Sequence, residues 1–558
     1  MSKVLLEGLL LFVFYALVLL VSFKDAITKF YPATDLWVIL AHSQSFNPGS
    51  WFLEGYREYF TLHGELSYQV YHYVRPVFNF LTWLLYELSG GRFYLFPVAG
   101  LLFHALSSAL AYGFVRRFVT GSRGPALLVS FIVFTFPEGA GLAYSWDFAQ
   151  DTIAFTLLLA ALTLYLSGRK GLAFALNAVG LLTKEQFLLF PVLTGLRELF
   201  LRRYGWAAAF LLSAAVYVLY KLAVFGAVGS EKTVGLDGSA PSKLPFVPLV
   251  LVNLELYFFH GFSLTETVKL VWENSSVFDK LGLILNALSL FMLIAGLALR
   301  RVSPFLGGFA VVYDAFPLLV KTSLGGVNLR FVLYGRFFTL AAVAELLKSR
   351  PALLYGFLAA VLLVQLHTLF LLGGFSGLAS VYAAFREECR VLAEELKACS
   401  RGGRVYLIGK DACFNYGVKG VAAVLGLRGE VVPVFNFLTR KPAYELLKLK
   451  NDGLELRVKL RSLAEFFGHT ANMSPERVFK RAERDGRTLR VKKEGVVYEI
   501  KLAKECKELK PSCRVEEFKI KISLKDNDAV FLVNDRRSSC VYASTQGSTA
   551  SGTGLKTY

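Results

Sequence analysis

Ionisable side chains occur at the ends of long apolar segments in this sequence, or within them, where a charge is costly unless it has a role. They are Asp35, Arg75, His104, Asp147, Asp151, Lys184, Glu185, Arg330 and Arg336. A carboxylate can accept the proton of an attacking hydroxyl. Arginine can grip a phosphate through two parallel hydrogen bonds, and lysine can bind it as a point charge. The set therefore suits a transfer reaction in which a phosphate is the leaving group. The sequence has no Gly-rich phosphate-binding loop, so a nucleotide is not expected as the donor.

Asp35 is the strongest candidate for a catalytic base. It lies in the loop of residues 24–80, just past the end of the first apolar segment, so we expect it near the membrane–water boundary. A carboxylate at that depth suits a substrate carried by a lipid. The structural alternative is that Asp35 caps a helix or is a surface charge.

Each of the other candidates also has a structural alternative. Arg75 precedes Pro76 and could extend to lipid headgroups. His104, in LLFHALSSAL, could be a core histidine, and Asp151 could cap a helix. Lys184 and Glu185 could form a local ion pair. Arg330 and Arg336 could hold lipid phosphates, so the order and spacing of the set say more than any one member.

The elements that must position these residues are membrane helices. The chain has 558 residues, of which 55% are hydrophobic and gathered in long blocks. This predicts a polytopic α-helical membrane protein with about eleven transmembrane helices. The predicted spans are 6–23, 94–115, 124–137, 151–167, 171–183, 187–200, 205–226, 281–299, 304–320, 331–347 and 352–374. No small-residue cleavage site follows the first, which predicts a retained helix.

Basic residues recur in every second loop, and such loops are cytoplasmic in membrane proteins. They are Arg116, Arg117 and Arg123; Arg169 and Lys170; Arg197, Arg202 and Arg203; Arg300 and Arg301; and Lys348 and Arg350. This pattern predicts a multi-pass protein of the cell membrane with a cytoplasmic N-terminus. The Asp35 loop, the Lys184-Glu185 turn and the chain after residue 375 are then extracytoplasmic. Two apolar segments, 74–89 and 244–262, would break the alternation as spans. We expect both to lie in the outer interface, with a re-entrant segment as the alternative for 244–262.

The pattern changes after the last span. Residues 1–374 form the predicted membrane domain, and 375–537 a soluble extracytoplasmic α/β domain. In the latter, an amphipathic helix at 382–400 precedes short β-rich runs and a hairpin around Gly495. Residues 538–558 are rich in Ser, Thr and Gly and predict a flexible tail.

All six cysteines follow the last span: Cys389, Cys399, Cys413, Cys506, Cys513 and Cys540. On the extracytoplasmic side they favour disulfides, whose pairing the sequence leaves open. Part of the net charge of +19 lies in the basic loops between helices, whereas residues from 375 on carry 34 Lys and Arg against 22 Asp and Glu, a net charge of +12. No recognition helix or stacking-aromatic pattern accompanies it, so nucleic acid is not expected as a partner.

The ordered motifs resemble the GT-C integral-membrane glycosyltransferases, and most closely the dolichyl-phosphate-mannose-dependent transmembrane and tetratricopeptide-repeat mannosyltransferases. ATDLW carries Asp35, YHYVRPVFNF carries Arg75, and FPVAGLLFHALSSALAYGFVRRF carries His104. Pro137 precedes Asp151 at a similar spacing. LLTKEQF carries Lys184 and Glu185, and LRFVLYGRFF carries Arg330, Tyr334 and Arg336.

This resemblance implies a GT-C-like fold and an inverting transfer of a sugar from a polyprenyl- or dolichyl-phosphate donor to a protein or glycan acceptor. It implies Asp35 as the catalytic base. The residues expected to bind substrate are Arg75, His104, Asp151, Lys184, Glu185, Arg330, Tyr334 and Arg336. The family has a pair of acidic residues where Leu36 follows Asp35 here, so the need for a divalent metal stays open. No 34-residue repeat follows residue 375.

Two other classes of function remain in view. A lipid or solute transporter, or flippase, would show internal repeats and helices broken near the bilayer centre. A non-catalytic membrane scaffold would display the C-terminal domain and would be indifferent to Asp35→Asn. The predicted partners are therefore a polyprenyl-phosphate sugar, membrane lipids and a protein or glycan acceptor.

Overall fold

The structure is a computed structural model. It describes residues 3–33, 36–53, 61–62, 67–68, 75–225, 276–319, 332–410, 413–414, 418–436, 444–450, 453–458, 483–493, 495–506, 513–534 and 537–542. Asp35, Arg330 and the apolar segment 244–262 lie outside these residues, so what we expect of them stays a prediction.

The chain folds into two compact units. Unit 1 comprises Met1–Phe30, Phe46–Gly55 and His72–Phe385. Unit 2 comprises Tyr31–Ser45, Tyr56–Tyr71 and Arg386–Tyr558. The predicted division at residue 374 stays a prediction, and part of the first loop is grouped with the C-terminal residues.

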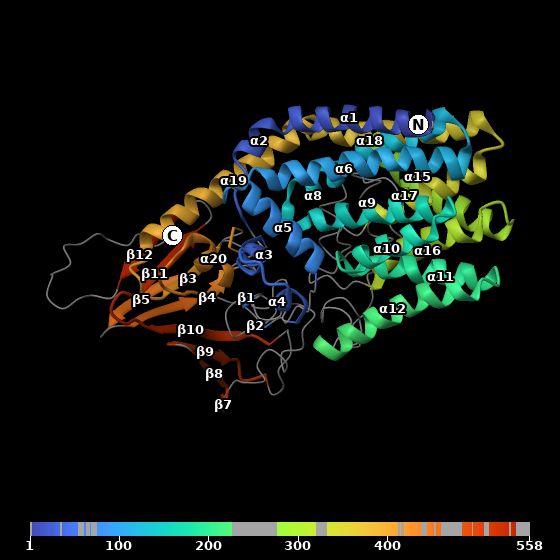
Figure 1. The fold of residues 1–558 in the computed structure, drawn as a ribbon. Helices are drawn as coiled ribbons and strands as arrows, with labels where there is room; N and C mark the ends of the chain where they lie inside the picture. Colours follow the sequence, from blue (N-terminus) through green and yellow to red (C-terminus); the bar gives the residue numbers. More distant parts are fainter. Residues whose placement is uncertain are drawn as a thin grey trace. The chain divides into compact units, whose positions relative to one another are not determined.

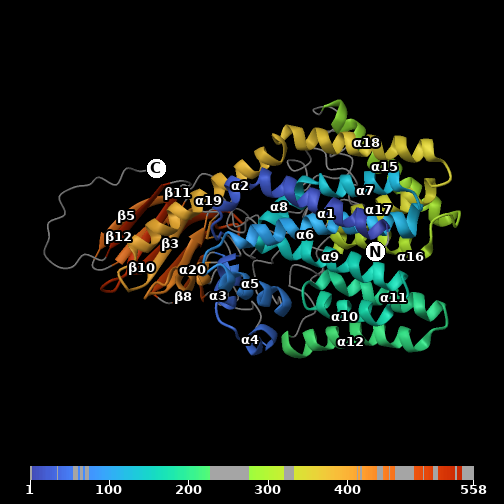
Figure 2. The same ribbon diagram turned by 45° about the horizontal axis from the view of Figure 1, so that its top comes forward.

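Unit 1 is helical. Its elements are α1 (Lys3–Ser22), α2 (Lys24–Thr28), α4 (Pro48–Leu53), α5 (Pro76–Leu88), α6 (Leu95–Phe114), the π-helical η2 (Val115–Thr120), α7 (Arg123–Phe134), α8 (Pro137–Tyr144), α9 (Trp146–Leu166), α10 (Lys170–Leu181), the 3-10 turn η3 (Glu185–Leu188), α11 (Leu189–Phe200), α12 (Tyr204–Phe225), α15 (Val277–Ala298), α16 (Pro304–Leu319), α17 (Val332–Leu347) and α18 (Pro351–Leu371). Figures 1 and 2 show the long helices running alongside one another, with α1 beside α6.

Every apolar segment that we predicted as a span contains a helix. Within the part of the chain that the structure describes, six helices are long and apolar enough to cross a membrane. They are Lys3–Ser22, Leu95–Thr120, Trp146–Leu166, Tyr204–Val224, Val277–Ala298 and Pro351–Leu371. Three shorter apolar helices are Arg123–Phe134, Lys170–Leu181 and Pro304–Tyr313. The membrane character is thus confirmed, whereas the count of about eleven spans stays a prediction.

Unit 2 contains two larger sheets and a short hairpin of β1 (Thr61–Leu62) and β2 (Ser67–Tyr68). The six-stranded antiparallel sheet has the order β5 (Tyr444–Lys450), β6 (Gly453–Val458), β10 (Val515–Ser523), β9 (Val496–Leu502), β8 (Thr488–Lys493) and β7 (Glu483–Asp485). The four-stranded sheet has the order β12 (Arg537–Tyr542), β11 (Ala529–Asn534), β3 (Val405–Lys410) and β4 (Val431–Asn436). Among the described residues of unit 2, the helices are α3 (Leu36–Ser43), α20 (Val418–Leu425) and the end of α19 (Gly374–Cys399), which continues from unit 1.

Unit 2 has the predicted α/β character with some corrections. The β8–β9 hairpin is present, and Gly495 supplies the positive φ of +87° that its turn needs. The strand β12 extends to Tyr542, so the predicted start of a flexible tail at residue 538 falls inside a strand. Disulfides join Cys389 to Cys413, Cys399 to Cys540 and Cys506 to Cys513. The bond at Cys540 explains why this serine-rich stretch is held in the sheet.

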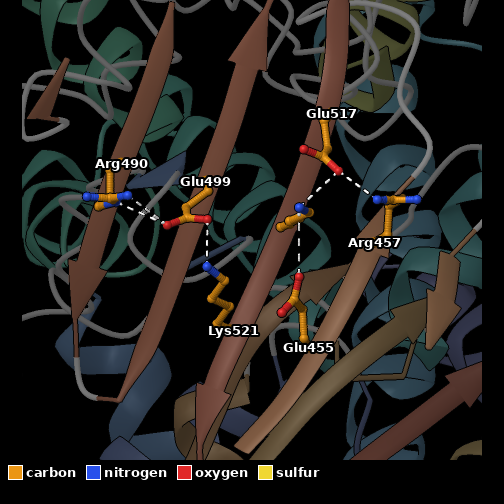
Figure 3. A network of polar contacts seen from close by, with 7 residues as sticks. Glu455, Arg457, Arg490, Glu499, Glu517 and Lys521 are labelled. Atoms are coloured by element: carbon orange, nitrogen blue, oxygen red, sulfur yellow. Dashed lines mark hydrogen bonds and ion pairs between the residues drawn. The ribbon is translucent and has the colours of Figure 1, made fainter. Parts of the chain in front are cut away.

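One face of the six-stranded sheet is a lattice of ion pairs. Along β10, Phe518, Ile520 and Ile522 are buried, which turns Glu517, Lys519 and Lys521 to the other face. Figure 3 shows how charges alternate across the strands there. Lys521 donates to Glu499 at 2.8 Å, and Arg457 to Glu517 at 2.8 Å. Such cross-strand pairs stabilise a sheet modestly and fix its register.

We expect the stability of this sheet to fall in mild acid. The hydrogen bond from Lys521 holds the pKa of Glu499 below its usual value, and the bond from Lys519 does the same for the pKa of Glu517. A lowered folded-state pKa stabilises the fold above the unfolded-state pKa of about 4.3, and this is lost as the pH falls through the folded-state value. The protection factors of amides in β9 and β10, which are corrected for the intrinsic exchange rate at each pH, should therefore fall as the pH falls from about 5 to 3. Glu499→Gln should weaken that dependence, and an unchanged dependence would contradict the assignment.

Candidate active site

Five charged side chains form a buried charge cluster in unit 1: Arg75, Asp151, Lys184, Glu185 and Lys221. Arg75, Asp151, Lys184 and Lys221 are each at most 6% exposed, and the side chain of Glu185 is 22% exposed. Buried charges persist in a fold only when they are paired and hydrogen-bonded. The cluster contains four of the residues that the sequence selected, and it adds Lys221.

Arg75 is positioned by the proline that follows it. Pro76 is the first residue of α5, where its missing N–H costs no helical hydrogen bond. Proline disfavours helical backbone at the residue before it, so Arg75 stands outside the helix with φ −140°. The N–H of Val77 donates to the carbonyl of Leu182 at 3.3 Å, which ties the start of α5 to the end of α10. This contact brings Arg75 beside the Lys184-Glu185 turn.

Helix α9 supplies Asp151 from its second turn. It begins at Trp146, earlier than the predicted 151, so Asp151 does not cap the helix. The indole N–H of Trp146 donates to the Thr82 hydroxyl at 2.8 Å, and its ring stacks on Phe78 with centroids 5.1 Å apart. Both partners lie on α5, so this tryptophan fixes α9 against the helix that follows Arg75.

The Lys184-Glu185 turn directs two adjacent charges to different partners. Lys184 has extended backbone, with φ −155°, immediately before η3. Its N–H donates to the carbonyl of Gly180 at 3.1 Å. A Cβ at Gly180 would lie 2.4 Å from the ring of Phe187, so only glycine lets the turn fold back on α10. Lys184 and Glu185 each form an ion pair with a residue of another element.

The distances define those pairs. Arg75 donates to Glu185 Oε2 at 2.9 Å and to Gln150 Oε1 at 2.5 Å. Lys184 Nζ lies 2.9 Å from the Asp151 carboxylate oxygens. Lys221 Nζ is 3.9 Å from Glu185 Oε1. The cluster thus brings three cations together with two carboxylates.

Glu185 remains ionised in this environment. Burial alone would raise its pKa, but the positive charges of Arg75, Lys221 and Lys184 outweigh burial and hold the pKa at about 2. Glu185 is therefore a permanent anion at neutral pH. Its chemistry is that of a counter-ion that orients cations, rather than that of a proton carrier.

Helix α17 touches the cluster through Tyr334. Its hydroxyl donates to the main-chain carbonyl of Asp151 at 3.0 Å, and its ring stacks on Tyr313 with centroids 5.1 Å apart. Arg336 on the same helix is buried, with its guanidinium carbon 3.9 Å from the ring centroid of Phe136. Tyr334 therefore supports the backbone of Asp151, whereas the ring contact places Arg336 against the residue that precedes α8.

His104 lies among the helices that border α6. Its Nε2 is 3.1 Å from the carbonyl oxygen of Phe134, and its ring stacks on the phenyl ring of that residue. A Cβ at Gly139 would lie 2.6 Å from the imidazole, which shows how closely α8 approaches. These contacts fit the alternative of a core histidine.

Two members of the site escaped the sequence analysis. Lys221 is a fully buried cation inside α12, and the search for charges in apolar segments would have found it there. Gln150 carries no charge and gave no such signal. Among the residues that the structure describes, no group of three or more His, Cys, Asp or Glu side chains is arranged to hold a metal ion.

No family model and no curated protein matches this chain. Among solved structures, the chain is similar to the crystal structure of ArnT from Cupriavidus metallidurans bound to undecaprenyl phosphate. The two sequences are 13% identical, the match covers 75% of this chain and 85% of that one, and the TM-score is 0.42. That likeness is too low to assign a fold or a function, which therefore rest on the residues described above.

Proposed function

We propose that the protein is an inverting membrane glycosyltransferase that moves a sugar from a polyprenyl-phosphate donor to a protein or glycan acceptor. The observation that carries the proposal is the buried charge cluster, which gathers three cations within a bundle of apolar helices. A phosphate headgroup on a lipid is an anion that such a bundle can receive from the membrane. The motif order that resembles the GT-C glycosyltransferases supports the same class.

The proposed reaction is a single displacement. The acceptor hydroxyl oxygen attacks the anomeric carbon and loses its proton to the Asp35 carboxylate, as a general base requires. The bond between the anomeric carbon and the phosphate oxygen breaks, and polyprenyl phosphate leaves with the electron pair. Arg75, Lys184 and Lys221 are the proposed groups that stabilise the charge on that phosphate. Attack opposite the leaving group inverts the anomeric centre.

The proposed side of the membrane is extracytoplasmic. The alternation of basic loops predicts it for the Asp35 loop and for the C-terminal residues. All six cysteines are paired in three disulfides. Disulfides persist in oxidising compartments and are rare in the cytosol, which supports the same orientation.

The test is transfer from a panel of radiolabelled polyprenyl- and dolichyl-phosphate sugars by the full chain in vesicles with acceptor-containing membranes. We expect transfer by the wild type and a loss of about 10²–10⁴-fold in Asp35→Asn, the usual contribution of a general base. Asp25→Asn is the matched control, because Asp25 is an exposed carboxylate on α2 in the same loop. Its rate should stay within about twofold of the wild type.

The outcomes separate the two parts of this proposal. Transfer that persists in Asp35→Asn would retain the enzyme class and refute the assignment of the base. Absence of transfer from every donor, with folded wild-type protein, would refute the class and favour a transporter or a scaffold.

A further inference from the structure

The segment that flanks Asp35 belongs to unit 2, although it precedes most of the membrane helices in the sequence. Tyr31–Ser45 is grouped with Arg386–Tyr558. Ala33 and Leu36 stand on either side of Thr34 and Asp35, and both are fully buried. The N–H of Leu36 donates to the carbonyl of Ala33 at 3.1 Å. The described residues on both sides of the proposed base in the sequence are therefore buried and belong to unit 2.

Trp37 is the main anchor of this segment. It lies two residues after Asp35 in the sequence and is fully buried. Its indole N–H donates to the main-chain carbonyl of Cys413 at 2.9 Å. Its ring packs against Tyr31 and Phe414, with centroids 5.8 Å and 6.0 Å away. A buried indole with a hydrogen-bond partner and aromatic neighbours is held in one orientation.

The acceptor of that hydrogen bond is itself held by a disulfide. Cys413 is bonded to Cys389 on α19. On the same helix, Arg386 is buried, and its guanidinium donates to the carbonyl of Tyr31 at 3.2 Å. Helix α19 thus holds the segment at two points, directly through Arg386 and through the disulfide to the partner of Trp37.

A second element of unit 2 fits α3 closely. A Cβ at Gly420 on α20 would lie 2.4 Å from the main-chain oxygen of Trp37. Glycine at this position is what permits the two backbones to approach. The segment around α3 therefore contacts α19, α20 and the Cys413-Phe414 pair. All three follow the membrane helices in the sequence.

We propose that Trp37 and the Cys389–Cys413 disulfide are positioning elements for Asp35. Transfer then depends on the oxidised state of this one disulfide. The inference rests on the proposed function. A dithiol reductant would break the S–S bond by two-electron exchange, giving two cysteine thiols and an oxidised reductant. Asp35 would stay chemically intact, but the segment that carries it would lose its fixed partner.

The first test is kinetic and uses the full chain in vesicles. Misplacing a catalytic group by about 1 Å can cost on the order of 10²-fold. We expect kcat to fall by about 100-fold in the double variant Cys389→Ser, Cys413→Ser. In Trp37→Phe, which loses the N–H donor and part of the buried ring, we expect kcat to fall by about 10-fold. The KM for the lipid donor should stay within about twofold, because the buried charge cluster is unchanged.

The matched control is the double variant Cys506→Ser, Cys513→Ser, which removes a disulfide of the same unit. It should keep the wild-type kcat. Dithiothreitol should lower kcat in the wild type and in this control alike, with no further effect on the Cys389→Ser, Cys413→Ser variant.

The second test is amide hydrogen exchange, which keeps the inference open to refutation if the cysteine variant folds poorly. Residues 36–43 should exchange faster in Trp37→Phe, while β3 and β11 keep wild-type protection and so report an intact unit. Wild-type kcat in Trp37→Phe despite faster exchange would overturn the positioning role. If both the exchange of residues 36–43 and kcat were unchanged in Trp37→Phe, Trp37 would not anchor this segment. A wild-type rate of transfer in Asp35→Asn would instead refute the assignment of the base. Failure of the proposed base and failure of the proposed positioning role can therefore be told apart.

Discussion

Arg75→Ala is expected to lower sugar transfer by about 10²–10³-fold per folded molecule, the usual cost of removing one charge-stabilising donor. The guanidinium donates to Gln150 and Glu185 at once. Its loss would remove the cation nearest to Glu185 in these pairs, since Lys221 lies farther away at 3.9 Å. The measurement is the initial rate of transfer from the active lipid donor, normalised to folded protein.

The conservative variant tests the geometry of this contact. Arg75→Lys keeps the charge, but an ammonium cannot reproduce the planar fork of arginine, so we expect about a 10-fold loss. Arg92→Ala is the control, since Arg92 is an exposed arginine just after α5. Wild-type rates in Arg75→Ala would contradict a role for the buried charge cluster in phosphate binding.

The pair of Lys184 and Asp151 should show the second large effect, in stability as well as in activity. Lys184→Met leaves the Asp151 carboxylate buried without its cation, and Asp151→Leu leaves the ammonium buried in the same way. Breaking a buried pair in this manner typically costs about 3–5 kcal/mol of unfolding free energy. We expect each single variant to unfold at a markedly lower temperature or denaturant concentration.

The double variant separates structure from function. Lys184→Met with Asp151→Leu removes both charges and should recover most of the lost stability, because apolar replacements of a buried pair are well tolerated. Transfer should nevertheless stay low, because the phosphate has lost a cation. A double-mutant cycle in detergent, with transfer rates on the same samples, measures both. Strictly additive stability losses would show that the two side chains do not act as a pair.

The sequence by itself determined the helices and most of the strands. A run of about twenty apolar residues is helical in a membrane whatever its neighbours, because its backbone groups must be satisfied internally. Alternation of apolar and polar residues likewise marked β10 and the β8–β9 hairpin. This pattern is visible within a single strand, because successive side chains point to opposite faces of the sheet. The same local reasoning selected Arg75, Asp151, Lys184 and Glu185. A charged residue in or beside an apolar segment can be recognised in the sequence before its ion-pair partner is known.

Only the tertiary structure decided which charges are paired. Lys184 is next to Glu185 in the chain, yet it binds Asp151 of α9, and Glu185 binds Arg75. The extended backbone of Lys184 and the close packing at Gly180 direct the two side chains apart, and neither is visible in a residue pattern. Lys221 joined the cluster for the same reason, because its partner comes from an element far away in sequence.

The two units were also decided by tertiary structure. The sequence placed the Asp35 loop with the membrane helices by proximity along the chain, whereas Tyr31–Ser45 folds with the C-terminal residues. Six cysteines allow many pairings, and only the fold selects Cys389 with Cys413. Local patterns report the preferences of one segment at a time, whereas partners are chosen by burial and hydrogen bonding between segments hundreds of residues apart.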